Sequence, residues 1–209
     1  MEASANRKTR PVELAVIFLI VTYIAHMLGQ VLQIGGAQLA PSIVVYTFLA
    51  FLLAADAGWL GMVAVGLGAG LLTMIATSSP FPPANIAAHG GGFLFAAYLG
   101  KKAAASGKRL EFRTFAAALV LTTLVSWTLF AVSTWLGLGG TDFVTRSWTR
   151  YGIGFGEGFV GWWLYGFLGV AVPSLVVGLV VAPALLSLGR RLGQSATDRS
   201  RPAGGAARR

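Results

Sequence analysis

The sequence predicts an all-α integral membrane protein, a bundle of six transmembrane helices with both termini in the cytoplasm. The first observation is composition, because hydrophobic residues make up 56% and charged residues only 11% of the 209 residues. The mean hydropathy is +0.72. A soluble domain of this size could not bury so much apolar surface in one core. The other two observations are the division of the apolar residues into six blocks and the position of the basic residues between them.

The six apolar blocks follow a polar leader at 1–10. They lie near 13–32, 39–55, 59–77, 84–100, 115–138 and 160–188. The second and fourth are short for a span of about 20 residues, so we expect them to tilt, thin the bilayer or borrow loop residues. The sixth block is long and contains Pro173 and Pro183. A proline cannot donate the helical hydrogen bond, so both should kink this helix.

The basic residues predict the orientation of the bundle. If the amino terminus is cytoplasmic, only Arg146 and Arg150 of the 16 basic residues lie outside. This is a strong positive-inside bias. We therefore expect a cytoplasmic leader at 1–10, a membrane domain at 11–189 and a basic cytoplasmic tail at 190–209. The tail has too little apolar surface to fold, which predicts disorder from Gln194 onward.

Three predicted outer loops, at 29–40, 78–83 and 139–159, lack an excess of cations. Together they could form an outward-open pocket for a small polar or aromatic molecule. Asn85 and His89 lie one helical turn apart in an apolar block, so they are expected to share a face. Buried polar groups are costly without a partner, which makes these two either ligand contacts or ties between helices. The candidate ligand-binding residues are Asn85, His89, Ser79, Gln33, Trp148, Arg146 and Arg150.

Several of these residues also have a structural interpretation. Arg146 and Arg150 are four residues apart and could clamp a carboxylate. Trp148 lies between them in the sequence and could stack on a ligand. A pairing of the two arginines with acidic residues of the same loop, Asp142 and Glu157, stays equally open. Other residues are assigned first to packing, namely His26 as a tie between helices, Trp162 and Trp163 in the interfacial belt, and Gly66, Gly70, Gly90, Gly91 and Gly92 at close helix contacts.

The sequence lacks the motifs of several chemistries. A GxxxxGK[ST] phosphate loop is absent, so the chain cannot hydrolyse ATP by that route. HExxH, GxSxG and paired carboxylates within the apolar blocks are absent too, so we expect neither an enzyme nor a cofactor. With two histidines and no cysteine, a zinc site is disfavoured, although His26 and His89 could join loop carboxylates in one. The basic residues do not form a stripe interleaved with aromatic residues, so the sequence does not indicate nucleic-acid binding.

Three stretches resemble a known family. They are ELAVIFLIVTYIAHMLGQVL at 13–32, AADAGWLGMVAVGLGAGLLTMIATSSPFPPANI at 54–86 and VAVPSLVVGLVVAPAL at 170–185. The most specific part is the corner ATSSPFPPANI, after a helix that begins just past Asp56. These residues resemble the S component, the substrate-capturing membrane subunit, of energy-coupling-factor transporters, and are most similar to the tryptophan-transporter family.

The resemblance implies a six-helix plasma-membrane protein that binds one small molecule near its outer face. The expected ligand is an aromatic amino acid such as tryptophan or a vitamin-like heterocycle. The expected partners are a transmembrane coupling subunit and ATPase subunits, which would energise uptake. The alternative is a membrane scaffold or assembly protein whose buried polar residues only tie helices together.

Overall fold

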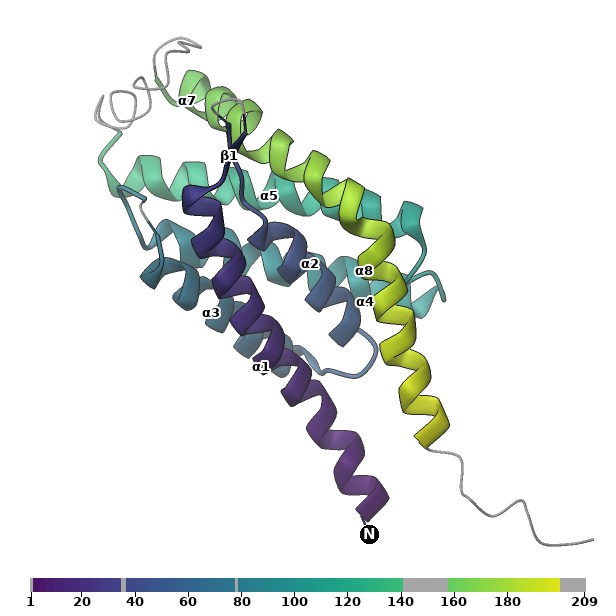
Figure 1. Cartoon of the computed structure of the whole chain (residues 1–209). Coiled ribbons are helices and arrows are strands. Elements are labelled where there is room, and N and C mark those ends of the chain that lie inside the picture. Colours follow the sequence, from purple (N-terminus) through teal and green to yellow (C-terminus); the bar gives the residue numbers. More distant parts are fainter. Residues whose placement is uncertain (1, 35–36, 78, 141–157, 200–209) are drawn as a thin grey trace, which may run out of the picture.

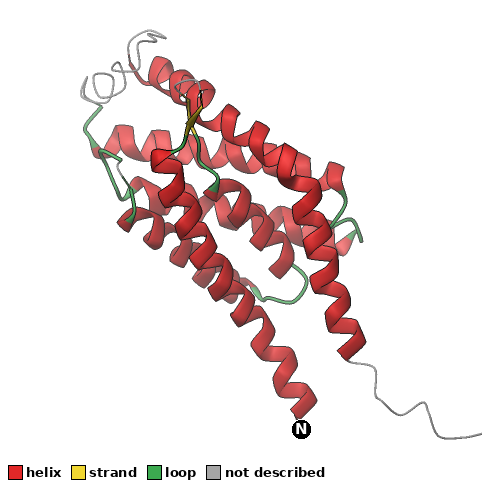
Figure 2. Cartoon of the chain, viewed as in Figure 1, coloured by secondary structure: helices red, strands yellow, loops and turns green. Residues whose placement is uncertain are grey.

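The computed structural model of the chain describes residues 2–34, 37–77, 79–140 and 158–199. Helices make up almost all of this part, which confirms the predicted all-α class (Figure 2). The helices are α1 (Glu2–Val31), α2 (Ser42–Leu53), α3 (Trp59–Ile75), α4 (Gly91–Ala105), α5 (Phe112–Gly137), α7 (Gly158–Gly166) and α8 (Val172–Arg199). Two π-helical turns, η1 (Ile86–Gly90) and η2 (Phe167–Ala171), precede α4 and α8.

The connection between α1 and α2 contains a small hairpin that the sequence did not predict. Strand β1 (Gln33–Ile34) pairs antiparallel with β2 (Ala37–Gln38), and Gln33 lies opposite Gln38. We call the end of the bundle that carries this hairpin the hairpin end, and the end that carries the α4–α5 connection at 106–111 the basic end. Figure 1 shows the two at opposite ends of the bundle.

Length and composition identify the chain as a membrane protein. Within the described residues, three helical stretches are long and apolar enough to cross a bilayer, namely Val12–Val31, Phe112–Gly137 and Gly158–Leu192. Ser42–Leu53 and Trp59–Ile75 are apolar but shorter. The described helices occupy the predicted apolar blocks, whereas six complete spans remain a prediction.

Two helices extend beyond the apolar blocks. Helix α1 includes most of the polar leader, and α8 continues to Arg199, past Gln194 where disorder was expected. Both extensions contain residues of high helix propensity, such as Ala3, Ala5 and Arg7 in α1 and Arg190, Arg191 and Leu192 in α8. The helical period therefore continues where the apolar pattern stops.

Helix α2 is the centre of the fold. All of its residues except Val45 are buried, and it packs against α1, α4, α5 and α8. Its 12 residues span only about 18 Å, against about 30 Å of hydrocarbon. The surrounding helices enclose α2, and the expectation that this short block tilts, thins the bilayer or borrows loop residues stays a prediction. A helix that is apolar on every side is best buried in protein.

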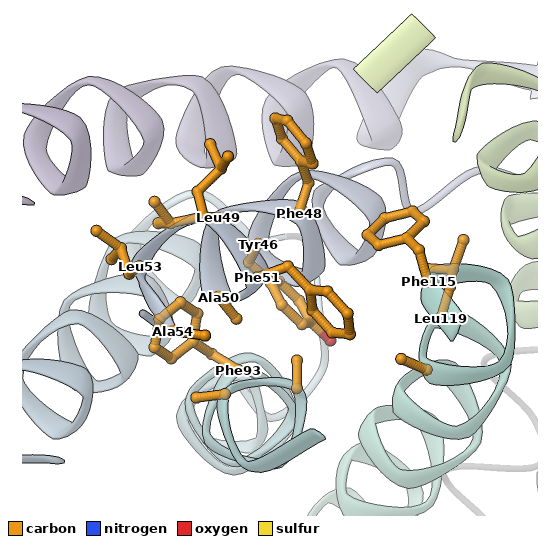
Figure 3. Close-up of a cluster of buried hydrophobic side chains, with 14 of the residues drawn as sticks. Tyr46, Phe48, Leu49, Ala50, Phe51, Leu53, Ala54, Phe93, Phe115 and Leu119 are labelled. Atoms are coloured by element: carbon orange, nitrogen blue, oxygen red, sulfur yellow. The ribbon is translucent and has the colours of Figure 1, made fainter. Parts of the chain in front are cut away.

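Aromatic residues form the contact between α2 and its neighbours. The Phe51 and Phe115 rings meet edge to face with centroids 5.4 Å apart, and Phe48 lies 5.7 Å from Phe18 of α1. Figure 3 shows Phe48 on the side of α2 that faces α1, with Phe115 of α5 beside it. Such aromatic pairs contribute beyond the area that they bury.

Basic side chains close the carboxyl end of α2. Lys101 Nζ donates to the Ala57 carbonyl at 2.7 Å and to the Ala54 carbonyl at 3.3 Å. Arg109 Nη1 donates to the Leu52 carbonyl at 3.0 Å. The last carbonyls of a helix have no helical donor and carry partial negative charge, so both cations stabilise this helix end.

The predicted glycine contacts are confirmed between α3 and η1. A Cβ on Gly70 would lie 2.8 Å from Ile86 Cα, and one on Gly90 would lie 3.1 Å from the Gly66 carbonyl oxygen. The two backbones therefore touch directly, as small residues allow in membrane bundles.

The two prolines of the last helix differ in their surroundings. Pro173 follows η2, so the helix changes from π to α geometry just before it. A π turn is one of the recognised causes of a break in a helix axis. Pro183, in contrast, lies inside α8, whose helical assignment continues through it.

Candidate functional site

The strongest candidate site is a buried polar cluster at the hairpin end, centred on His89. The ring is 6% exposed. His89 Nε2 lies 3.1 Å from Ser42 Oγ at the start of α2. The His26 ring of α1 meets it edge to face at 4.9 Å, and the Tyr46 ring lies at 5.7 Å. Helices α1 and α2 and the turn η1 therefore contribute to one polar site inside an apolar bundle.

His89 has an unused hydrogen-bonding atom. Its Nδ1 is buried and has no hydrogen-bond partner among the described residues. A buried polar atom left unpaired costs about 1–3 kcal/mol. A group that bonds Nδ1 would remove this cost, so the ring can bind a further polar atom.

The geometry of η1 fixes the position of His89. Its turns are closed by bonds from residue i+5 to residue i, and the Ala88 carbonyl accepts a further bond from Ser126 Oγ at 2.9 Å. A Cβ on Gly92 would lie 2.6 Å from the Tyr46 hydroxyl and 3.2 Å from Ser126 Oγ. A side chain at Gly92 would thus occupy the space between α2 and α5 beside the cluster.

His26 has a neighbour on its own helix. The Gln30 side-chain nitrogen lies 3.3 Å from His26 Nε2. An amide nitrogen can only donate, so Nε2 is the acceptor, and a neutral His26 carries its proton on Nδ1. The ring contact with His89 makes His26 a link between α1 and η1, in agreement with its predicted role as a tie between helices.

Asn85 and His89 are both buried but have different hydrogen-bond partners. Asn85 is 1% exposed, and its Nδ2 donates to the Pro82 carbonyl at 3.1 Å. The expectation that the two residues share a face stays a prediction, since the turn η1 between them keeps residues four apart on roughly the same side. Asn85 closes the corner that precedes η1, whereas His89 faces α1 and α2.

Of the other predicted ligand contacts, only Ser79 has a described side chain. Ser79 shapes the loop, since its Oγ accepts a bond from the Phe81 backbone nitrogen at 3.2 Å. Gln33 lies in the hairpin, and only its backbone is described. Trp148, Arg146 and Arg150 lie outside the described residues, as do their possible partners Asp142 and Glu157.

Three residues of the cluster were not predicted. Ser42, Tyr46 and Ser126 lie in apolar blocks where nothing in the spacing distinguishes them from packing residues. The one available signal was Ser42 directly after Pro41, a combination typical of a helix start. Their proximity to His89 arises only from the packing of α2 and α5 against η1.

A second, aromatic cluster lies between α5 and α7 near the hairpin end. Trp127 and Trp162 have centroids 5.9 Å apart, and Trp127 Nε1 donates to the Trp163 carbonyl at 3.0 Å. Trp162 is 2% exposed, so its predicted place in the interfacial belt is wrong. Close packing buries the indole, because Gly166 leaves room for the Trp127 ring.

The hairpin is joined to α8 at its base. The Ala40 backbone nitrogen donates to Ser174 Oγ at 2.7 Å, and Ser174 Oγ in turn donates to the Val170 carbonyl at 2.5 Å. Strand β2 also contacts η2. These contacts hold the α1–α2 connection across the end of the bundle where the cluster lies.

A metal centre has little support in the described part of the chain. No group of three or more His, Cys, Asp or Glu side chains comes together there. His26 and His89 form a pair without a third ligand of these types.

No family model matches the chain, and no curated protein and no solved structure matches it significantly. The site must therefore be judged on its own geometry.

Proposed function

We propose that this protein is the substrate-capturing membrane subunit of a nutrient uptake system, with an aromatic amino acid such as tryptophan or a vitamin-like heterocycle as ligand. The observation that carries the proposal is His89, a buried ring with an unpaired Nδ1 inside an apolar bundle. Polar and ionisable groups within a membrane bundle are costly and tend to mark substrate paths.

The charge distribution supports an outward-facing hairpin. The described basic side chains between 100 and 192 all belong to elements at the basic end. They are Lys101, Lys102, Lys108, Arg109, Arg113, Arg190 and Arg191. Positive residues favour the cytoplasmic side. In the proposed arrangement, six spans cross the plasma membrane, both termini are cytoplasmic and the His89 cluster lies near the outer surface.

The proposed ligand contacts combine one polar and several aromatic groups. His89 Nδ1 would bond a polar atom of the ligand, and the faces of His26 and Tyr46 would pack against its ring. His89 is enclosed, so a ligand must enter as the hairpin or a neighbouring loop moves aside. A coupling subunit and ATPase subunits would supply the energy, because the chain carries no phosphate-binding loop of its own.

A second candidate function is that of a membrane scaffold. The observation that favours it is that Asn85, His26 and His89 all contact other protein groups in the described conformation. Side-chain hydrogen bonds commonly hold membrane helices together. In this case the cluster would stabilise the bundle, and no small molecule would bind it.

Ligand retention distinguishes the two functions. The protein, purified in mild detergent, is analysed by mass spectrometry for retained small molecules, and candidate aromatic amino acids and heterocycles are then titrated by calorimetry. His89→Ala should weaken binding at least about tenfold, which corresponds to the loss of one good hydrogen bond in a buried site.

Thr47→Val is the matched control for His89→Ala. Thr47 is buried on α2, but its hydroxyl donates only to the Ile43 carbonyl of its own helix, at 2.6 Å. This variant should bind as the wild type does. Equal binding by H89A and wild-type protein would reject the site, and no binding of any tested compound together with no co-purified ATPase would favour the scaffold.

A further inference from the structure

The cationic side chains at the basic end are of two kinds. Those of the first kind are bonded within the protein. Lys101 and Arg109 donate to the carbonyls at the end of α2, and Arg190 Nη2 donates to the Leu110 carbonyl at 3.0 Å. These three cations therefore already have hydrogen-bond partners within the protein.

The second kind comprises Lys102, Lys108 and Arg113, which are exposed. None of the three side chains forms an ion pair or a hydrogen bond with the described part of the chain. They all belong to the segment 101–113, in which Glu111 is the only acidic residue. Lys102 Nζ lies 4.7 Å from the centroid of the Tyr98 ring, on the same helix.

Exposed aromatic residues lie at the same end of the bundle, one of them, Tyr98, beside Lys102. Trp59 is 50% exposed at the start of α3, Tyr98 is 43% exposed near the end of α4, and Phe112 is 45% exposed at the start of α5. Lys101 Nζ lies 5.6 Å from the Trp59 ring. Exposed aromatic side chains at helix ends mark the boundary between hydrocarbon and headgroups. Basic residues at or just beyond this boundary meet the level of lipid phosphates.

We propose that this surface of the basic end binds the headgroup of an anionic phospholipid, with Lys102, Lys108 and Arg113 as the contact residues. A lipid phosphate accepts charge-assisted hydrogen bonds from ammonium and guanidinium groups. Each basic residue near an anionic leaflet strengthens the attraction, so three together give a clear preference over a zwitterionic lipid. The surface lies at the opposite end of the bundle from His89, so this inference does not depend on nutrient capture.

The test compares two lipids that differ only in the headgroup. The full chain in mild detergent is titrated with phosphatidylglycerol or phosphatidylcholine of identical acyl chains, and bound lipid is measured by native mass spectrometry. We expect the wild type to prefer phosphatidylglycerol at least about tenfold. The K102Q/K108Q/R113Q variant should bind the two lipids within about a factor of two of each other.

Two control variants test whether the lipid preference depends on these three residues or on the total charge of the protein. R201Q/R208Q/R209Q removes the same charge from the tail and should keep the preference, as should the charge-conserving K102R/K108R/R113K. If the first triple variant does not fold, each single glutamine variant replaces it and should show part of the loss. Unchanged preference in the glutamine variants, or an equal loss in the tail variant, would overturn the proposal. Competition by free glycerol 3-phosphate that is as strong as competition by the lipid would also overturn the proposal.

Discussion

At the scale of single residues, His89 shows how burial makes an ordinary side chain informative. One ring nitrogen is bonded to Ser42, and the other is buried and unpaired within the described structure. In an apolar interior both nitrogens must find partners or cost free energy. The ring is thus positioned by the protein on one side and able to bind a further group on the other.

Ser42→Ala tests the positioning of this ring. The variant removes the only described hydrogen-bond partner of His89, so we expect a loss of about 1 kcal/mol in the free energy of unfolding, within the range measured for side-chain bonds between membrane helices. Thermal unfolding in detergent measures the change. Thr47→Val, on the same helix, should have little effect because the Ile43 carbonyl keeps its helical donor. Equal stability of S42A and wild type would show that the bond to His89 contributes nothing.

At the scale of elements, two π turns and a short central helix determine where the polar groups lie. Helix α2 is too short to span a bilayer but is enclosed by its neighbours, with Ser42 and Tyr46 beside η1. The turn η1, which carries His89, begins directly after Asn85, whose side chain bonds the Pro82 carbonyl. Direct backbone contact between α3 and η1 holds this turn in place.

Gly70→Ala tests the contact of α3 with η1. The added Cβ would lie 2.8 Å from Ile86 Cα, a backbone atom that cannot move alone. We expect a loss of about 1–3 kcal/mol in stability, as for overpacking elsewhere. Gly61→Ala on the same helix is the matched control, since nothing lies within 4 Å of its Cβ. Thermal unfolding of the two variants should differ in sign, because alanine favours a helix over glycine by up to about 1 kcal/mol. Similar melting temperatures would contradict the packing.

At the scale of the whole molecule, charge divides the bundle into two ends. The hairpin, η1 and the aromatic cluster gather at one end, and the basic segment 101–113 lies at the other (Figure 1). The positive-inside rule turns this asymmetry into an orientation. Nutrient capture depends on this orientation, since it needs an outer hairpin, whereas lipid binding needs only a headgroup layer at the basic end, which either leaflet provides.

Cysteine accessibility tests the orientation. The chain contains no cysteine, so single cysteines can be introduced without background. Thr141→Cys should react with a membrane-impermeant maleimide on intact cells, whereas Lys108→Cys should react only after permeabilisation. The control is the cysteine-free parent, which should not react. Labelling of K108C from outside would reverse the proposed topology.

The sequence by itself determined the helical class, the membrane character and the approximate positions of the helices along the chain. These follow from composition and local pattern, which report burial and propensity residue by residue. It also indicated Gly66, Gly70 and Gly90 as close contacts, because small residues have few other uses in such helices.

Only the tertiary structure decided which polar residues meet. Ser42 and Tyr46 lie far from His89 in the sequence, and their contact depends on how α2 packs against η1. Asn85 and His89 are near in the sequence yet have different partners, because Asn85 bonds the corner before η1 and His89 meets Ser42 of α2. The sequence predicts Trp162 as an interfacial residue, but its side chain is buried beside Trp127. Each of these outcomes depends on contacts between elements, which a periodic pattern along one chain does not encode.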